Sequence, residues 1–293
     1  MLPAADSFHP RHAEDFVHTV SGRRVRTPRD MWYPPRPAVE LGLDRCRRQV
    51  IIKAVAPGAA EARILERLAL GPLRDHPDNH TIPIVSILHN IIINDRATFL
   101  VHAQWGQWRL ERTPCSLSFW AGTQAYQLLQ GLAFMHDQGI AHGDLYYGNI
   151  VCNFGSLRSR DNPCLSFENF QESGNYRVAF IDFGEARDFG VSGSIQIPCP
   201  RPVSGPPADF RAPEIDHCKT FDPFAADVFS MARLVLALDP RLRSDLQKIP
   251  EAYRALLNDM GHPDPSVRPS ARVALERLES LNRFQTAHQW CAS

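Results

Sequence analysis

Short apolar runs of strand-like composition dominate the early part of the chain. Gln49–Val55, Ile84–Ile93 and Ala97–Val101 are rich in β-branched residues, and a polar turn at Asn94-Asp95 separates the last two. Between the first and second runs, the apolar positions of Ala59–Leu70 recur at the spacing of a helix. The pattern therefore predicts a small, mainly β region that contains one helix.

From residue 118 onward the apolar positions follow helical spacing, as in the stripe Leu128, Leu129, Leu132 and Met135. This helix is expected to stop near Gly139, because glycine often caps the C-terminus of a helix. The other elements expected here are one strand, Arg177–Ile181, and three helices, Phe224–Leu238, Glu251–Met260 and Ala271–Leu281. The second region is therefore expected to be mainly helical.

Three segments lack a regular pattern. Residues 1–38 contain prolines and a basic cluster, and we interpret them as an irregular N-terminal arm. Residues 155–176 are polar and rich in turn formers, as expected of a surface insertion, and residues 190–208 carry enough proline and glycine to predict an extended segment. Together with the two patterned regions, this predicts an α+β protein.

Composition narrows the class of protein. Lys+Arg and Asp+Glu both total 32, so no net field attracts nucleic acid or an anionic membrane, and we expect neither as a partner. Met1–Phe16 lacks the apolar core of a signal peptide, and no apolar run is long enough to span a bilayer. The seven cysteines form no CxxC pair and are expected to be reduced thiols. A cytoplasmic or nuclear location is therefore expected.

Lys53 and Glu61 both occupy apolar faces. Lys53 shares a strand face with Ile51 and Val55, and Glu61 lies at helical spacing from the apolar positions that follow it. An unpaired buried charge is costly, so a pair between the two side chains would satisfy both. The alternative is a lysine that extends to solvent from an edge strand and a half-exposed glutamate; we favour the pair.

Two acids and an amide stand at a distinctive spacing. The first stretch is His142-Gly143-Asp144-Leu145-Tyr146-Tyr147-Gly148-Asn149, and the second is Ile181-Asp182-Phe183-Gly184. A loop aspartate often only caps a turn, but agreement at several positions is difficult to reach by chance. Carboxylate and amide oxygens are the ligands that Mg²⁺ prefers, and phosphoryl transfer needs a carboxylate beside the attacking hydroxyl.

These motifs resemble the catalytic loop and metal-binding turn of the protein kinase superfamily. The resemblance implies that Asp144 acts on the substrate hydroxyl and that Asn149 and Asp182 bind Mg²⁺. It also implies that Lys53 holds the ATP phosphates, that Glu61 orients Lys53, and that His142 and Gly184 are structural. Gly184 is expected to permit the turn that presents Asp182.

Two later segments resemble the same family. Ala212-Pro213-Glu214 is similar to the end of its activation segment, and Asp264–Ser270 is similar to the segment that closes its fold. The resemblance implies a buried ion pair between Glu214 and Arg268. It also implies that Asp227 hydrogen-bonds to the backbone of the catalytic loop.

The resemblance implies a bilobal protein-kinase-like fold over residues 39–285. A small β-rich N-lobe with one main helix would occupy residues 39–103, a larger helical C-lobe would occupy residues 104–285, and a tail would follow at 286–293. The implied activity is transfer of the ATP γ-phosphate to a protein hydroxyl of serine or threonine. The sequence looks most similar to short, divergent kinase-like proteins of mushroom-forming fungi.

The sequence also departs from the family pattern. Between Gly22 and Lys53 the only glycine is Gly42, so no glycine-rich phosphate loop is visible. Gly143 stands where the family carries an arginine, and Tyr146 stands where members that act on serine or threonine carry a lysine. These departures leave a weakly active or inactive scaffold as an alternative function. A small-molecule kinase is a remote third, because such enzymes share the His-Gly-Asp sequence but lack the two later segments.

Overall fold

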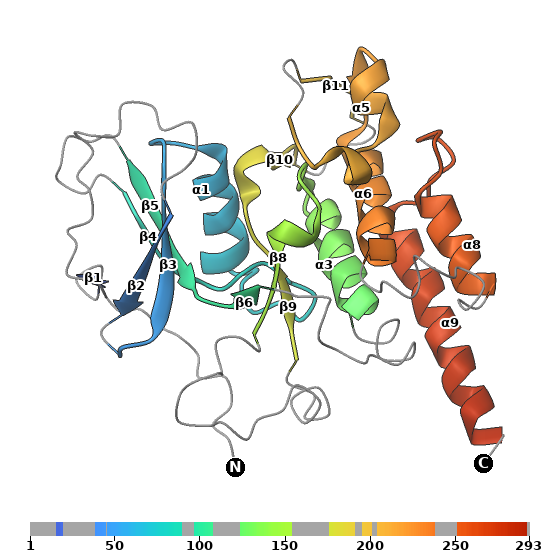
Figure 1. The fold of residues 1–293 in the computed structure, drawn as a ribbon, viewed down its shortest axis with the longest axis horizontal. Coiled ribbons are helices and arrows are strands. Elements are labelled where there is room, and N and C mark those ends of the chain that lie inside the picture. Colours follow the sequence, from blue (N-terminus) through green and yellow to red (C-terminus); the bar gives the residue numbers. More distant parts are fainter. Residues whose placement is uncertain are drawn as a thin grey trace. The chain divides into compact units, whose positions relative to one another are not determined.

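The computed structural model describes residues 16–19, 39–44, 46–89, 97–107, 124–153, 176–190, 195–200, 204–237 and 251–291. The protein is a mixed α/β structure (Figure 1) with an antiparallel sheet and several helices. The chain divides into two compact units. Unit 1 comprises Met1–Asp75 and Ile82–Trp105, and unit 2 comprises His76–Thr81 and Gly106–Ser293.

Unit 1 is built on a five-stranded antiparallel sheet with the strand order β1-β2-β3-β5-β4. Its strands are β1 (Phe16–Thr19), β2 (Val39–Asp44), β3 (Gln49–Val55), β4 (Ile84–Leu88) and β5 (Thr98–Ala103). Val50, Val85, Leu88 and Val101 pack into one buried apolar cluster of this sheet. The strand predicted at Gln49–Val55 is confirmed.

The edge of the sheet differs from what the sequence predicts. Residues 1–38 were expected to be irregular, but Phe16–Thr19 forms β1 and pairs antiparallel with β2. Neither strand was predicted, because both are short runs and the pairing of β1 with β2 spans the residues between Thr19 and Val39. The other residues of the predicted arm lie outside the described residues. The strand predicted at Ile84–Ile93 ends at Leu88, and the turn at Asn94-Asp95 also lies outside them.

The helix predicted at Ala59–Leu70 is present in two parts. An α-helix, α1 (Ala60–Leu65), continues directly into one wider π-helical turn, η3 (Glu66–Leu70). Ile64, Leu65 and Leu68 are buried, and Arg63 is exposed. The predicted helical phase is therefore confirmed, and it places Glu61 on the buried face.

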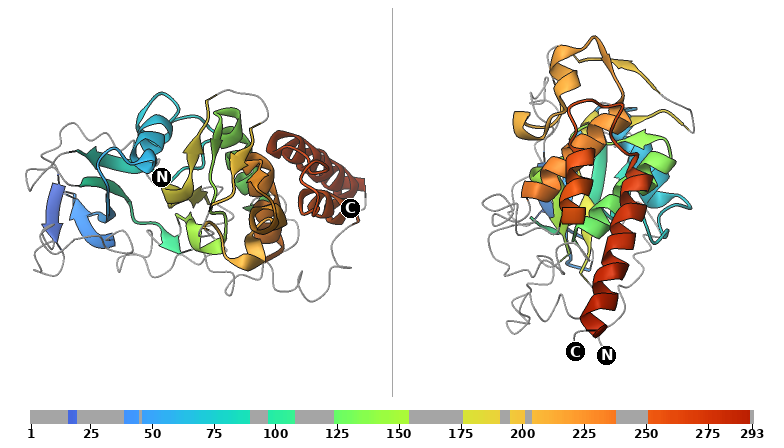
Figure 2. Two further views of the ribbon diagram at one scale, coloured as in Figure 1. Left: turned by 90° about the horizontal axis from the view of Figure 1, so that it is seen from above. Right: turned by 90° about the vertical axis from the view of Figure 1, so that its right-hand side faces the viewer.

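Unit 2 is mainly helical (Figure 2). Its α-helices are α3 (Tyr126–Asp137), α5 (Pro213–His217), α6 (Pro223–Ala237), α8 (Glu251–Met260) and α9 (Ala271–Cys291). Its short strands are β6 (Gly106–Gln107), β7 (Ile140–Ala141), β8 (Ile150–Cys152), β9 (Val178–Phe180), β10 (Arg187–Asp188), β11 (Ile197–Pro198) and β12 (Thr220–Phe221). Helices α6 and α9 both pack against α3.

The predicted helices of unit 2 are present: α8 has the predicted ends, whereas α6 and α9 have shifted ends. The stripe on α3 is buried, and the chain leaves this helix through Gly139, whose φ of 73° is left-handed. Helix α9 runs to Cys291, past the predicted end at Leu281, and the predicted strand is shortened to β9. Most of the expected insertion lies outside the described residues. Within the segment expected to be extended, β11 pairs with β12.

A buried histidine ties the start of unit 2 to its core. His80 is 4% exposed, and its ring nitrogens lie 3.0 Å from the Val178 carbonyl and 2.9 Å from Gln130 Oε1. Burial lowers the pKa of His80 below its ordinary value. Gly131 makes room for the His80 side chain, since a Cβ at position 131 would lie 2.6 Å from His80 Cβ. The network holds β9, which leads into the turn at Asp182, against α3.

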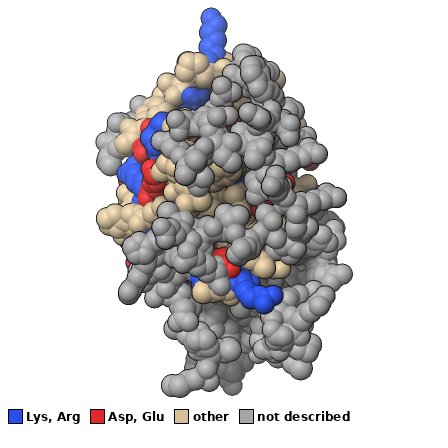
Figure 3. Space-filling model, turned by 90° about the vertical axis from the view of Figure 1, so that its left-hand side faces the viewer, with Lys and Arg blue, Asp and Glu red and all other residues tan. Residues whose placement is uncertain are grey.

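The surface carries charges of both signs. On the face shown in Figure 3, the blue and red side chains of the described residues lie next to one another. This arrangement agrees with the equal totals of basic and acidic residues, both 32. Among the described residues, no helix is long and apolar enough to cross a membrane.

Candidate functional site

In unit 1, Lys53 and Glu61 form the predicted ion pair. Lys53 Nζ lies 2.7 Å from Glu61 Oε1, and the two residues are only 8% and 6% exposed. β3 supplies the lysine and α1 supplies the glutamate, so the pair ties the helix to the sheet. A buried pair is costly to desolvate, so its presence is weak evidence of a contribution to stability.

The sheet face around Lys53 is apolar and partly open. Val39 of β2 is directly opposite Lys53, Leu41 is opposite Ile51, and the two β2 side chains are 54% and 41% exposed. On the other side of β3, His102 of β5 is opposite Ile51. Burial lowers the pKa of His102, and Lys53 adds to the effect. This face of the sheet thus combines the Lys53 ammonium group, the imidazole of His102 and the exposed aliphatic side chains of β2.

In unit 2, the loop after β7 holds Asp144 and Asn149 together. Asn149 Nδ2 donates to the Asp144 carbonyl and to Asp144 Oδ2, both at 2.8 Å. Burial raises the pKa of Asp144 to about 6; the bond from Asn149 opposes the rise, and the charges of Asp182, Glu185 and Asp227 add to it. A carboxylate with such a pKa is suited to taking up a proton near neutral pH.

Asp227 of α6 fixes the start of this loop, as the resemblance implied. Its Oδ2 accepts from the His142 N–H at 2.7 Å, and its Oδ1 accepts from the Gly143 N–H at 2.9 Å. Asp227 is only 2% exposed, and His136 Nε2 lies 3.2 Å from its Oδ2. Two peptide N–H groups are thereby satisfied by one carboxylate, which sets the backbone direction just before Asp144.

His142 links the loop to the second motif. Its side chain is fully buried, and its Nε2 lies 3.2 Å from the Ile181 carbonyl. The Ile181 N–H donates to the Asn149 carbonyl at 3.0 Å, and the His142 ring lies 5.0 Å from the Phe183 ring. The residue before Asp182 is therefore attached to the Asp144 loop at two points.

The turn at Asp182 has its left-handed backbone at the aspartate. The φ of 61° belongs to Asp182 itself, and Gly184 has no positive φ. The expectation that Gly184 permits the turn stays a prediction. Gly184 donates its N–H to Asp182 Oδ1 at 3.4 Å. Asp182 is exposed and tolerates this region because aspartate is one of the few residues with a side chain that does so.

Glu214 and Arg268 form the predicted buried ion pair. Arg268 donates from its two terminal nitrogens to the two Glu214 oxygens, at 2.6 and 2.8 Å. It also donates to the carbonyls of His262, Pro263 and Ala225, and its guanidinium lies 4.9 Å from the centre of the Phe229 ring. This pair joins α5 to the segment before α9 and supports the site without entering it.

Aromatic side chains beside Asp144 were not identified from the sequence as a cluster. The Tyr147 ring lies 5.5 Å from Tyr146 and 5.6 Å from Phe210, and Tyr147 is 45% exposed. Burial raises the pKa of Tyr146, and the carboxylates of Asp144 and Asp182 add to it. Two adjacent tyrosines were visible in the sequence, but Phe210 comes from a distant segment.

The residues present fit Mg²⁺. The described residues contain no group of three or more acids, histidines and cysteines that could hold a metal. However, Mg²⁺ usually takes only one or two protein ligands and completes its shell with water and phosphate. With the Asn149 amide nitrogen engaged by Asp144, the amide oxygen of Asn149 and the exposed carboxylate of Asp182 are the oxygens suited to this ion.

Similarity to known proteins covers only part of the chain. No protein-family model matches it. A stretch of 112 residues is 31% identical to the serine/threonine-protein kinase chk1 of Schizosaccharomyces pombe, and this stretch is 38% of the chain and 18% of that relative. The chain thus matches less than a fifth of the relative's length. This partial similarity suggests the protein kinase superfamily, and the mixed α/β structure is compatible with such a fold.

Proposed function

We propose that this protein is a phosphotransferase of the protein kinase type, which moves the γ-phosphate of ATP to a serine or threonine hydroxyl of a protein. The observation that carries the proposal is the Asp144 loop: Asn149 holds the carboxylate at 2.8 Å while Asp227 fixes the two preceding peptide groups. The partial match to a serine/threonine-protein kinase supports the proposed activity. The proposal also includes a bilobal fold.

We assign nucleotide binding to unit 1. Lys53 would bind the phosphates, and Glu61, 2.7 Å away, would hold its ammonium group in place. The exposed face of Val39 and Leu41, on the same side of the sheet as Lys53, offers an apolar surface to an adenine ring. The combination of a fixed cation and an apolar face suits a ligand that is both aromatic and anionic.

Unit 2 is assigned to the transfer step. Asp144 would orient the acceptor hydroxyl and take its proton while the acceptor oxygen bonds to the γ-phosphorus and the bond to ADP breaks. Asn149 and Asp182 would hold Mg²⁺, which supplies positive charge to the phosphates. Because the pKa of Asp144 is about 6, the carboxylate is largely ionised at neutral pH.

A scaffold without catalysis is the second candidate. The chain has only Gly42 between Gly22 and Lys53, so a backbone cradle for phosphates is not evident. Tyr146 also stands where a lysine would add charge stabilisation. The scaffold would keep the ion pairs and the Asp144 loop but show no transfer.

A binding titration followed by a transfer assay separates the two candidates. We expect ATP binding that requires Mg²⁺, and transfer to a mixed peptide array that Asp144→Asn reduces on the order of a hundredfold or more without weakening nucleotide binding. Asp75→Asn is the matched control, because the Asp75 side chain is 93% exposed. Binding without any transfer would establish the scaffold, and equal activity of Asp144→Asn would refute the proposed role.

A further inference from the structure

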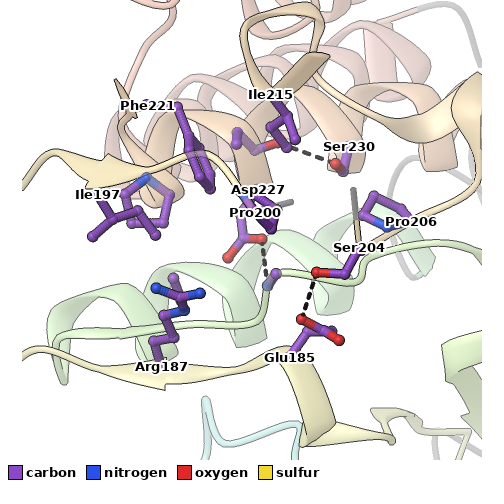
Figure 4. A pocket seen from close by; sticks show the side chains of 15 residues that line it. Glu185, Arg187, Ile197, Pro200, Ser204, Pro206, Ile215, Phe221, Asp227 and Ser230 are labelled. Atoms are coloured by element: carbon purple, nitrogen blue, oxygen red, sulfur yellow. Dashed lines mark hydrogen bonds between the residues drawn. The ribbon is translucent and has the colours of Figure 1, made fainter. Parts of the chain in front are cut away.

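Two cavities of unit 2 differ greatly in size. Figure 4 shows the smaller one, where Ser204 Oγ donates to Glu185 Oε2 at 3.0 Å; its volume of about 40 Å³ is enough for only a few water molecules. The larger cavity has a volume of about 650 Å³, which lies within the range of small-molecule binding sites. Its walls come from the end of α3, the start of α6 and the segment that leads into α9, so we call it the α3–α6–α9 cavity.

Part of the wall of this cavity is apolar. Phe224 and Val228 of α6 line it together with Pro265 and Pro269. Phe224 is half-buried, and its ring lies 4.9 Å from the ring of His136, which also lines the cavity. This part of the wall suits the apolar or aromatic body of a ligand.

The two arginines of the cavity are already engaged. The five N–H groups of Arg268 all have acceptors, which are two carboxylate oxygens and three carbonyls. Arg272 donates to Asp137 Oδ2. This bond raises the pKa of Arg272, and the charges of Asp137, Asp78 and Glu276 add to the rise. The positive charges of the wall are therefore balanced by acids of the protein itself, so the cavity offers little to an anionic ligand.

Two acids in the wall retain an oxygen that can accept a hydrogen bond. Asp222 Oδ1 caps the start of α6 by accepting from the N–H groups of Phe224 and Ala225, at 2.8 and 3.3 Å, whereas Asp222 Oδ2 has no partner among the described residues. Asp137 bonds to Arg272 through Oδ2, and its side chain is 45% exposed. Each acid therefore has one oxygen for a donor group on a ligand.

His136 adds a third acceptor. Its side chain is only 10% exposed, and Nε2 lies 3.2 Å from Asp227 Oδ2. Because a carboxylate can only accept, Nε2 of the neutral ring carries the hydrogen, and Nδ1 carries the lone pair. Within the part of the chain that the structure describes, no group donates to Nδ1. A side chain that is nine-tenths buried in the wall of the cavity therefore has an unused acceptor.

We propose that the α3–α6–α9 cavity is a binding site for an organic ammonium ion, an amine carried on an aromatic or apolar body. An ammonium group has three donors, and Asp137, Asp222 and His136 Nδ1 supply three acceptors. The Phe224 ring adds attraction for a cation. A ligand that donates to Nδ1 would also hold the His136 tautomer that donates to Asp227. The site is separate from the proposed phosphate transfer and does not depend on it.

The test is a calorimetric titration of the whole chain, in a buffer free of amines, with three ligands that share an indole ring. Tryptamine carries an ammonium group, tryptophol carries a neutral hydroxyl, and indole-3-acetate carries a carboxylate. We expect tryptamine to bind at least about tenfold more tightly than tryptophol, because hydrogen bonds between charged groups are the stronger ones. Indole-3-acetate should bind more weakly than tryptophol.

Variants of the two acids locate the binding site. Asp222→Asn keeps an acceptor at the start of α6 and removes one charge, so it should weaken tryptamine binding about tenfold and leave tryptophol binding unchanged. Asp137→Asn is a second variant with the same expectation. Asp75→Asn is the matched control, because the Asp75 side chain is 93% exposed and does not line the cavity. Arg272→Ala frees Asp137 from its partner and should preserve or strengthen tryptamine binding.

Weaker tryptamine binding in either acid variant, without a change in Asp75→Asn, would uphold the site. Equal affinities for tryptamine and tryptophol would overturn the proposal, as would a tryptamine affinity that neither acid variant changes. Binding of indole-3-acetate that Arg272→Ala abolishes would show that the cavity takes anions instead. Absence of tryptamine binding at millimolar concentration would refute the proposal as well.

Discussion

The side-chain amide nitrogen of Asn149 donates hydrogen bonds to both the carbonyl oxygen and Oδ2 of Asp144, each at 2.8 Å. The amide oxygen of Asn149 is then the atom suited to a metal ion. One side chain therefore couples the proposed proton acceptor to the proposed Mg²⁺ site. A change at Asn149 is therefore expected to change the pKa of Asp144 as well.

The first prediction concerns that pH dependence. Because the pKa of Asp144 is about 6, phosphate transfer should fall as the pH drops through that value. The bond from Asn149 lowers the pKa of Asp144, so Asn149→Ala should move the acid limb of the profile to higher pH. Single-turnover rates at saturating nucleotide across the pH range measure the shift. An unmoved acid limb would assign the titration to another group.

The second prediction concerns stability. Burial raises the pKa of Asp144 in the folded chain to about 6 from an ordinary 3.8, so between these values the folded state binds more protons than the unfolded state. Stability then decreases as the pH rises through this window, and the ionised Asp144 destabilises the fold above it. Asp144→Asn should therefore be more stable than the wild type near pH 8 and lose that advantage near pH 4. Urea denaturation at both pH values measures the difference, and a variant less stable at the higher pH would contradict it.

Much of the site could be predicted because its residues obey local periodicity or stand at fixed spacing. The phase of the helix at Ala59–Leu70 placed Glu61 on the buried face, and the strand at Gln49–Val55 placed Lys53 opposite it. The pairing of Glu214 with Arg268 did not follow from any local pattern. These residues are 54 positions apart, and only the family resemblance predicted their contact.

The rest depended on contacts that no local pattern encodes. Strands β1 and β2 are short, and their pairing spans the intervening residues between Thr19 and Val39. The bond between Ser204 and Glu185 joins residues 19 positions apart in the sequence, so neither residue carried a local signal. The left-handed backbone at Asp182 was not predicted, because a residue other than glycine rarely adopts this conformation.

The third prediction separates the effect of the Lys53–Glu61 ion pair on nucleotide binding from its effect on stability. Lys53→Met removes the ammonium group that pairs with the buried Glu61 carboxylate and should cost about 3–5 kcal/mol in the free energy of unfolding. Adding Glu61→Leu should recover most of that loss, since replacing a whole buried pair with apolar groups is often close to neutral. Nucleotide binding should remain lost in both. Urea denaturation and ATP titration measure the two effects, and a single variant as stable as the double would show that Glu61 finds another partner.

The last prediction uses the unusual backbone of Asp182. Asparagine tolerates a φ of 61° about as well as aspartate, so Asp182→Asn should preserve the turn and remove only the charge. Asp182→Ala removes the charge and adds backbone strain of roughly 1–2 kcal/mol. Both variants should weaken binding of ATP in the presence of Mg²⁺ by at least about tenfold, or 1.4 kcal/mol, and leave metal-free binding unchanged. Only Asp182→Ala should lower the melting temperature. Calorimetric titrations with and without Mg²⁺, together with thermal denaturation, measure both effects. If Asp182→Asn bound ATP equally well with and without the metal, Asp182 would not be a ligand, and its conformation would have to serve the fold alone.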